Sequence, residues 1–305
     1  MSDKPAVGFI GVGLMGKGMA KNAVENGYPV TVVAHRKREA VDDLIQRGAT
    51  EATSAKELAA TVDVIVLCVT GAPQVEEALR KPDGILAGAR KGLTIIDCST
   101  SEPDVTERLQ KELAERGITF IDAPLSRTPA HAWDGELTTF VGGPDELVKK
   151  WHPLLSTWAS VILPTGGPVG SAHALKLVNN LMSIGYAALW SECYAMMGKI
   201  ALKPQVLREL IENTGMNCGN FQNFSKYICD GDPNAHQFSL SNCLKDMTYY
   251  NRLASKHNTA TLMSAGALET LKLGINMGFG ERNIPETVDI VQRLNGQQEG
   301  PATDN

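Results

Sequence analysis

The stretch VGFIGVGLMGKGMA, from Val7 to Ala20, decides how the first half of the chain folds. Its apolar start is followed at once by the spacing Gly-x-Gly-x-x-Gly, which Gly11, Gly13 and Gly16 supply. Between a strand and a helix, the first glycine permits a tight turn, the second lets the backbone approach a pyrophosphate, and the third lets helix and strand pack closely. The free N–H groups and the dipole at the helix N-terminus favour the phosphates. The stretch predicts a dinucleotide-binding turn, provided that strands and helices alternate after it.

Strand-like apolar runs do alternate with amphipathic segments through the first half of the chain. These runs are Val7–Ile10, Val30–Ala34, Val62–Val69, Leu93–Thr100, Thr119–Pro124, Leu137–Gly143 and Ala159–Gly166. The third run is apolar almost throughout, as expected of a strand that is buried on both faces. The alternation predicts an α/β fold with a mostly parallel, doubly wound sheet of the Rossmann type.

The second half, after the glycine-rich stretch 164–170, predicts only helices. They are expected at Ser171–Ile200, Gln205–Asn213, Leu240–Lys256, Thr261–Met277 and Pro285–Leu294. The first of them contains no proline and is apolar nearly all round, so we expect it to be buried on most faces at a domain or subunit interface. We predict a Rossmann domain at 1–165, an all-α substrate and oligomerisation domain at 166–296, and a disordered polar tail at 297–305. The long helix also predicts a homodimer or homotetramer.

Composition excludes several classes of protein. The net charge of −5 argues against a nucleic-acid-binding protein, which usually carries a basic face. No apolar run approaches the roughly 20 residues that cross a bilayer, and the first residues contain no apolar signal core. The six cysteines are scattered and form no C-x-x-C pair, which favours free thiols in a reducing cytoplasm and no metal site.

The end of the second predicted strand indicates which dinucleotide is bound. A carboxylate at this position would hold the ribose hydroxyls of NAD. Here His35, Arg36 and Lys37 occupy it, and the next acid is Glu39. A guanidinium attracts a 2′-phosphate and can pair with it through two hydrogen bonds, so the sequence favours NADP over NAD, with Arg36 as the main contact. The alternative is a solvated basic loop, above all for Lys37 and its neighbour Arg38.

Five motifs together resemble the β-hydroxyacid dehydrogenase family, which includes 3-hydroxyisobutyrate dehydrogenase and tartronate semialdehyde reductase and is related to 6-phosphogluconate dehydrogenase. They are the glycine turn, DCST (Asp97–Thr100), DAPLSRT (Asp122–Thr128), KLVNN (Lys176–Asn180) and LKDM (Leu244–Met247). They extend over nearly the whole chain, in the family's order and spacing. The resemblance implies an NAD(P)-dependent enzyme that transfers a hydride between nicotinamide and a small anionic β-hydroxy acid or its semialdehyde, without a metal.

The motif KLVNN contains the residues expected to carry the chemistry. Lys176 and Asn180 are four residues apart and therefore share one helix face. A lysine near a buried face has its charged form disfavoured, which suits proton exchange near neutral pH, whereas a lysine that extends to solvent would have no such role. The resemblance implies that Lys176 is the general acid/base and that Asn180 holds the reacting oxygen.

The motif DAPLSRT departs from the family's D-A-P-V-S-G-G. Ser126 falls where the family has its substrate-binding serine, but Arg127 and Thr128 replace the two glycines. Arg127 would add a fork of donors for a carboxylate, sulfonate or phosphate, unless it is only a surface charge. This variant, together with Asn179 and Ser183, resembles sulfolactaldehyde reductases, although that subgroup has glycine in place of Ser126. We therefore expect a short, strongly anionic aldehyde or alcohol, with sulfolactaldehyde as one candidate.

The resemblance also implies the cofactor contacts. In the family, the residue matching Lys245 reaches across the cleft to the cofactor, the next aspartate supports the site, and the residue matching Thr100 lies near the nicotinamide. Val69 and Thr70 stand where the family has a Leu-Pro turn, so only their backbone is expected to make contact. The expected cofactor-binding set is Gly11, Gly13, Leu14, Met15, Gly16, His35, Arg36, Lys37, Val69, Thr70, Thr100 and Lys245.

Two other functions share this architecture. Imine reductases usually carry Asp or Tyr in place of the lysine, and non-catalytic interaction modules of this fold lack it. Lys176 disfavours both alternatives, and the acidic composition without a basic tail further disfavours the interaction module.

Overall fold

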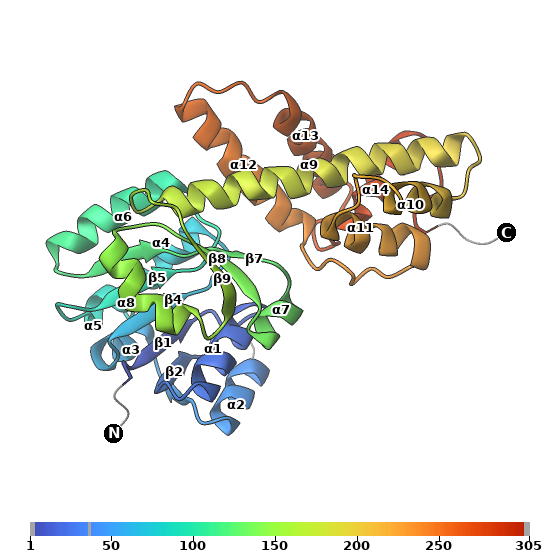
Figure 1. Cartoon of the computed structure of the whole chain (residues 1–305). Coiled ribbons are helices and arrows are strands. Elements are labelled where there is room, and N and C mark those ends of the chain that lie inside the picture. The colour runs from blue at the N-terminus through green and yellow to red at the C-terminus, as the bar shows by residue number, and fades with distance from the viewer. Residues whose placement is uncertain (1–3, 36–37, 302–305) are drawn as a thin grey trace. The chain divides into compact units, whose positions relative to one another are not determined.

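The chain folds into two compact units, Met1–Lys176 and Leu177–Asn305, which we call the α/β unit and the helical unit. The structure is a computed structural model that describes residues 4–35 and 38–301 (Figure 1). All strands found among the described residues lie in the α/β unit, and the secondary structure of the helical unit is helical. The predicted fold class, a Rossmann sheet followed by an all-α region, is confirmed.

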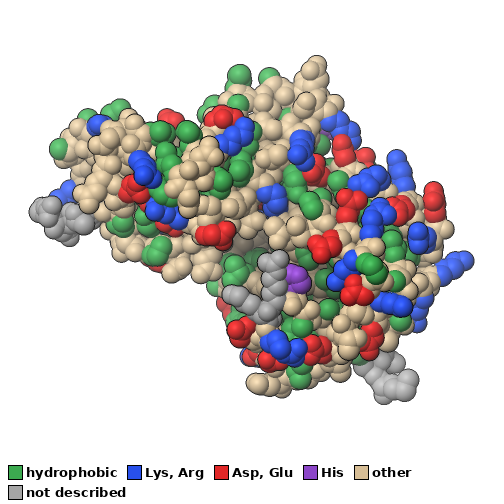
Figure 2. Space-filling model, turned by 180° about the vertical axis from the view of Figure 1, so that it is seen from behind, with side chains coloured by type: hydrophobic (Ala, Val, Ile, Leu, Met, Phe, Trp, Pro, Cys, Tyr) green, Lys and Arg blue, Asp and Glu red, His purple; other side chains and the backbone are tan. Residues whose placement is uncertain are grey.

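The surface is of mixed charge. On the face that Figure 2 shows, Lys and Arg side chains are intermixed with Asp and Glu side chains. Over the residues that the structure describes, none of the helices combines the length and the apolar character needed to cross a bilayer.

The α/β unit is built on a six-stranded parallel sheet with the order β3-β2-β1-β4-β5-β6. The strands are β1 Val7–Ile10, β2 Val30–Val33, β3 Thr50–Ala52, β4 Val64–Leu67, β5 Thr94–Asp97 and β6 Thr119–Asp122. All residues of β4 and β5 are buried, as expected of central parallel strands. Strand β3 was not predicted, because it has three residues and two of them are exposed. The strand order reverses between β1 and β4, where ligands bind in sheets of this kind.

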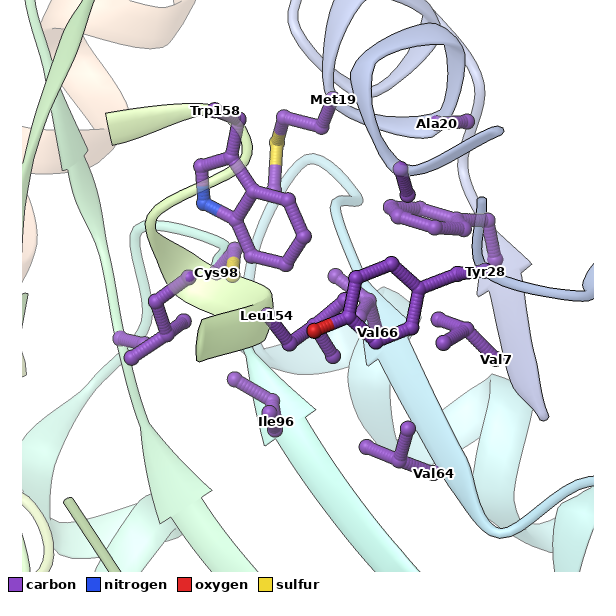
Figure 3. Close-up of a cluster of buried hydrophobic side chains, with 14 of the residues drawn as sticks. Val7, Met19, Ala20, Tyr28, Val64, Val66, Ile96, Cys98, Leu154 and Trp158 are labelled. Carbon is purple, nitrogen blue, oxygen red and sulfur yellow. The ribbon is translucent and has the colours of Figure 1, made fainter. Parts of the chain in front are cut away.

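Helices pack on both faces of this sheet and create two cores. They are α1 Gly16–Glu25, α2 Glu39–Gln46, α3 Ala55–Thr61, α4 Ala72–Arg80, α5 Ile85–Gly88, α6 Pro103–Glu115, α7 Pro129–Asp134 and α8 Asp145–Leu155. In one core, Met19 of α1 and Trp158 face side chains of β1, β4 and β5 such as Val66 and Ile96 (Figure 3). The other core joins the opposite sheet face to α3, α4, α5 and α6.

The last two predicted strands form a separate sheet. Strand β8 (Leu137–Val141) pairs in parallel with β9 (Ala159–Pro164) and antiparallel with the short β7 (Leu125–Ser126). We had expected both runs to extend the doubly wound sheet. Their apolar patterns predict strands correctly, but which strand pairs with which is decided by long-range packing.

The described part of the helical unit contains the five predicted helices, the last of them divided into a 3-10 helix and an α-helix, and one further helix, α11. They are α9 Ser171–Lys199, which begins in the α/β unit, α10 Pro204–Glu212, α11 Gly219–Asp230, α12 Leu240–Lys256, α13 Leu262–Asn276, the 3-10 helix η1 Ile284–Glu286, and α14 Thr287–Leu294. Aromatic side chains form the centre of its core, where the Trp190 ring lies 5.3 Å from the Phe221 ring, edge to face. Helix α11, which was not predicted, contributes Phe221 to this core.

Residues 166–176, with the first turn of α9, belong to the α/β unit rather than to the helical unit. The segment predicted to be a disordered tail begins with residues in contact with the helical unit: the Gln297 side chain donates to the Ala195 carbonyl over 3.0 Å, and the Gly300 N–H donates to Asp289 over 3.2 Å. The limits 1–165 and 166–296 stay predictions about independent domains.

Candidate functional site

The glycine turn lies at the point where the strand order reverses. Gly11 has a φ of 94°, and a Cβ there would overlap the Cys68 carbonyl oxygen. A Cβ on Gly16 would overlap the Gly11 carbonyl oxygen, whereas one on Gly13 would have no heavy atom within 4 Å. Met15, at the N-cap of α1, offers the helix no side-chain hydrogen bond. The turn thus presents open space beside Gly13 at the N-terminus of α1, whose dipole favours an anion, and this fits a dinucleotide pyrophosphate.

The other expected cofactor contacts of the sheet lie along the same edge. Strand register places Leu67, the last residue of β4, opposite the last residues of β1 and β5. Val69 follows β4 and donates its N–H to the Ser99 hydroxyl over 3.0 Å, which ties the two loops together. Thr70 is exposed and Thr100 is half-buried at this edge. The structure therefore brings the glycine turn, residues 69–70 and Thr100 to one end of the sheet.

The basic segment after β2 is described only in part. Arg36 and Lys37 lie outside the described residues, and His35 before them is exposed. Arg38 forms a two-bond pair with Glu51, at 3.0 and 2.9 Å, and a third bond to Asp42 at 3.0 Å. The guanidinium of Arg38 is thus engaged within the protein by two carboxylates.

The loop that is expected to bind substrate, which we call the substrate loop, begins at Arg127, directly after β7. Arg127 has a φ of 85°, a left-handed conformation that is unfavourable for any residue except glycine, and its side chain is exposed. One of its five N–H donors bonds to the Glu136 carbonyl over 3.0 Å. Ser126 and Thr128 on either side are half-buried, and the Thr128 hydroxyl lies 2.7 Å from His131 Nδ1. Arg127 therefore takes the backbone position that suits the family's glycine while presenting a cation.

Helix α7 holds this loop against α1, the helix that follows the glycine turn. A Cβ on Gly18 would lie 2.5 Å from the carbonyl carbon of Ala132, so the two backbones touch. Asn22 donates its side-chain amide to the Ala132 carbonyl over 2.8 Å, and Lys21 Nζ donates to the Trp133 carbonyl over 3.0 Å. The loop that follows β7 is thereby fixed to the helix that is expected to receive the cofactor phosphates.

Lys176 lies in the part of α9 that belongs to the α/β unit and is half-buried. The N-terminus of this helix is held by Asp122, the last residue of β6. Its carboxylate accepts the N–H groups of Gly170 and His173, both over 2.8 Å. A carboxylate at this end satisfies N–H groups that have no partner within the helix and complements its dipole. The start of α9, and with it Lys176, is therefore anchored to the sheet.

Asp246 organises the polar residues of the helical unit. It is 2% exposed, and its two carboxylate oxygens accept from Asn180 Nδ2 and from Lys245 Nζ, both over 2.6 Å. Asn179 Nδ2 donates to Asn180 Oδ1 over 3.2 Å, and Ser183 lies one turn further along α9. Lys176 and Asn180 are on one face of one continuous helix. Asp246, which the sequence suggested only as a supporting residue, connects the expected site residues of α9 and α12.

The sequence analysis did not single out three buried residues, two at the carboxyl ends of strands and one in the helix that packs beside them. Asp97 ends β5, Asp122 ends β6, and His173 lies in the first turn of α9; all three are 0% exposed. The available signal was that two apolar strands each end in aspartate. Among the described residues, no group of three or more His, Cys, Asp and Glu is arranged to hold a metal ion.

Both halves of the chain match family models that describe NAD-binding parts of dehydrogenases. Residues 6–167 match the model for the NAD binding domain of 6-phosphogluconate dehydrogenase, and residues 170–290 match that for NAD-binding of NADP-dependent 3-hydroxyisobutyrate dehydrogenase. The chain is 31% identical to 2-(hydroxymethyl)glutarate dehydrogenase of Eubacterium barkeri over 95% of its length and 96% of that protein. It is 32% identical to 3-sulfolactaldehyde reductase of Escherichia coli over 71% of this chain and 72% of the other. The crystal structure of 3-hydroxyisobutyrate dehydrogenase from Salmonella typhimurium superposes with a TM-score of 0.85, at 24% identity, covering 93% of this chain and 99% of that one.

Proposed function

The chain belongs to the β-hydroxyacid dehydrogenase family and is an NAD(P)-dependent oxidoreductase that acts on CH–OH groups, and on this premise we propose which of its residues perform the reaction and on what substrate. We propose that it interconverts a short, strongly anionic β-hydroxy acid and its semialdehyde, that Lys176 is the general acid/base, and that NADP is the preferred cofactor. Bound nicotinamide supplies or accepts the hydride.

The proton is handled by Lys176. In reduction, its ammonium donates a proton to the carbonyl oxygen as the hydride reaches the carbonyl carbon, and the alcohol forms; in oxidation, the neutral amine takes the hydroxyl proton back. Asn180 is bound to Asp246 through one of its two N–H donors, which leaves the second to hold the reacting oxygen. The observation that carries the proposal is that Lys176 and Asn180 share one face of a helix whose start is fixed to the end of β6 by Asp122.

The anionic group of the substrate is assigned to Arg127. Its guanidinium is exposed beside Ser126, and only one of its donors is used by Glu136. The two relatives are named for substrates with an anionic group at the far end of the carbon chain, a second carboxylate in one and a sulfonate in the other. A guanidinium binds either group through two parallel hydrogen bonds. Sulfolactaldehyde is therefore one candidate substrate among short anionic aldehydes.

The preference for NADP rests on the residues after β2. No acid stands between His35 and Glu39, and Arg38 is engaged by Glu51, which leaves Arg36 as the guanidinium proposed to pair with the 2′-phosphate. The expected result for Arg36→Ala is a lower kcat/KM with NADPH and an unchanged kcat/KM with NADH. A wild-type enzyme that uses NADH and ignores NADPH would overturn this assignment.

The proposed function is tested by a turnover screen with both cofactors. Serine, hydroxyisobutyrate, threonate and glycerate are tested for oxidation, and succinic semialdehyde and sulfolactaldehyde for reduction. Turnover of at least one anionic substrate, lost in Lys176→Ala while cofactor affinity is kept, supports the proposal. Turnover of a cyclic imine and of none of these substrates would indicate an imine reductase instead.

We also propose that a second copy of the chain covers the helical unit. Met182, Leu189 and Met196 recur every seven residues along α9 and are 52%, 50% and 60% exposed. A repeat of seven places all three on one stripe, which a second helix can cover. Val206 and Leu210 of α10 are likewise half exposed. Light scattering should give at least a dimer, and Leu189→Glu should yield the monomer. The six free cysteines favour a reducing compartment, the cytoplasm.

A further inference from the structure

His173 is a fully buried histidine that no motif of the sequence singles out. It lies in the first turn of α9, three residues before Lys176. A buried histidine needs partners for both ring nitrogens, and its contacts therefore restrict how the first turn of α9 can be oriented.

Three elements of the α/β unit meet at His173. Its backbone N–H donates to Asp122 at the end of β6 over 2.8 Å. Its ring Nδ1 lies 2.8 Å from the hydroxyl of Thr106 in α6. Its ring Nε2 faces Asp97 Oδ2, at the end of β5, over 3.8 Å. The other oxygen of Asp97 accepts the Ser99 N–H over 2.9 Å, so the carboxylate is held in place from its far side.

The proton positions follow from the single hydrogen of Thr106. The Thr106 hydroxyl lies 3.1 Å from the Glu102 carbonyl, which can only accept. When the hydroxyl donates there, Nδ1 must carry the proton toward Thr106, and the gap between Nε2 and Asp97 must hold a further proton to avoid two facing lone pairs. Nε2 and Asp97 Oδ2 are both buried without another hydrogen-bond partner in the structure. A proton between them satisfies both atoms after a small approach, and burial, which raises the pKa of Asp97, favours keeping it.

On the basis of the proposed function, we propose that His173 is a positioning residue for the reaction: by joining α6 and the ends of β5 and β6, it fixes the first turn of α9 and thereby the direction from which Lys176 reaches the substrate oxygen. Because proton transfer requires close alignment, a small rotation of this turn lowers kcat. Binding of substrate and cofactor does not depend on the alignment of this one amine. The role is thus distinguished from general structural support by a loss in kcat without a matching change in KM or cofactor affinity.

The experiment uses the full-length enzyme with His173→Leu, His173→Gln and Thr106→Val. His173→Leu retains the volume but removes both ring contacts, and its kcat should fall about tenfold or more, with substrate KM and NADPH Kd within about twofold of wild type. His173→Gln, which can still donate and accept, should recover most of the kcat. Thr106→Val should show the same selective loss to a smaller degree. The matched control is Thr139→Val, since the Thr139 hydroxyl is equally buried but has no hydrogen-bond partner in the structure.

The outcomes are separable from those of the proposed function. A kcat within twofold of wild type in both His173→Leu and Thr106→Val overturns the proposal, and so does a kcat that falls only together with the affinities. If His173→Leu does not fold, Thr106→Val against Thr139→Val decides. If the wild type turns over none of the substrates, the proposed function fails, and hydrogen exchange still tests the anchoring. Amides 173–176 should then exchange faster in Thr106→Val than in wild type and Thr139→Val, and equal rates overturn it.

Discussion

Asn180 of α9 donates its side-chain amide to Asp246 of α12 over 2.6 Å, and the second oxygen of the same buried carboxylate accepts from Lys245. This arrangement fixes the orientation of the Asn180 side chain, with its NH2 group toward Asp246. It also neutralises the charge of a carboxylate that burial would otherwise make unfavourable.

We expect Asp246→Asn to lower kcat about 10- to 100-fold, because the transition state loses part of its stabilisation. An amide in this place has one acceptor oxygen and cannot serve both Asn180 and Lys245. Steady-state kinetics measure the effect. Asp230→Asn, which alters an exposed pair with Arg208, is the control and should stay within about twofold. An unchanged kcat in Asp246→Asn would show that Asn180 needs no such partner.

Lys176→Ala should lower kcat by about 10² to 10⁴, the usual range for removal of a general acid/base, and leave the NADPH Kd unchanged. Lys176→Arg should not restore activity, because a guanidinium does not release its proton near neutral pH. Fluorescence titration of NADPH and stopped-flow hydride transfer are the measurements. Lys199→Ala at the end of the same helix is the control. Full activity in Lys176→Ala would remove the proposed chemistry.

Gly18→Ala should separate α7 from α1, because the added Cβ would lie 2.5 Å from the Ala132 carbonyl carbon. We expect the Tm to fall and the substrate KM to rise, since α7 follows the substrate loop. Gly13→Ala, where the added Cβ meets open space, should keep the Tm and weaken cofactor binding instead. Gly185→Ala in α9 also adds a Cβ in open space and should do neither. The opposite pattern between Gly18 and Gly13 would contradict the roles assigned to the two positions.

Arg127→Gly should raise the KM for an anionic substrate while the unfolding free energy stays within about 1 kcal/mol of wild type. Glycine relieves the left-handed backbone at φ 85°, which offsets the lost bond to Glu136. Arg127→Lys keeps the charge but not the fork of donors, and should show an intermediate KM. Kinetics with paired substrates that differ in one anionic group test the role. An unchanged preference in Arg127→Gly would assign the anion to another residue.

The stability of the α/β unit should fall as pH rises through the range in which Asp97 ionises. Burial raises the pKa of this carboxyl above its ordinary value of 3.8. Between the pKa of Asp97 in the unfolded chain and its raised pKa in the folded chain, the folded chain keeps a proton that the unfolded chain has released. Each increase in pH within this range therefore favours unfolding. Asparagine does not titrate, and it can still accept the Ser99 N–H. The Tm of Asp97→Asn relative to wild type should therefore be more favourable at pH 7.5 than at pH 4.

Exposed Asp232 provides the control for that experiment, since Asp232→Asn should shift the Tm equally at both pH values. A Tm difference for Asp97→Asn that is constant with pH, or larger at pH 4, would mean that the folded chain does not hold a proton on Asp97 in this range.

The sequence by itself determined the features that depend on local pattern. The glycine spacing after an apolar run predicted β1, the turn and α1. The change from alternating strand-like and helical segments to helical segments alone predicted two kinds of unit. Lys176 and Asn180 could be placed on one face because helix geometry relates residues four apart. Resemblance of five motifs in order predicted the family.

Only the tertiary structure decided the features that join distant parts of the chain. No local pattern shows that β8 and β9 leave the main sheet, that Gly18 touches Ala132, or that Asp246 binds Asn180. The same holds for His173, whose partners come from three separate elements. The physical reason is that a side chain's periodicity records which face it occupies, whereas its partner is chosen by packing and by the need to satisfy buried polar atoms across the folded chain.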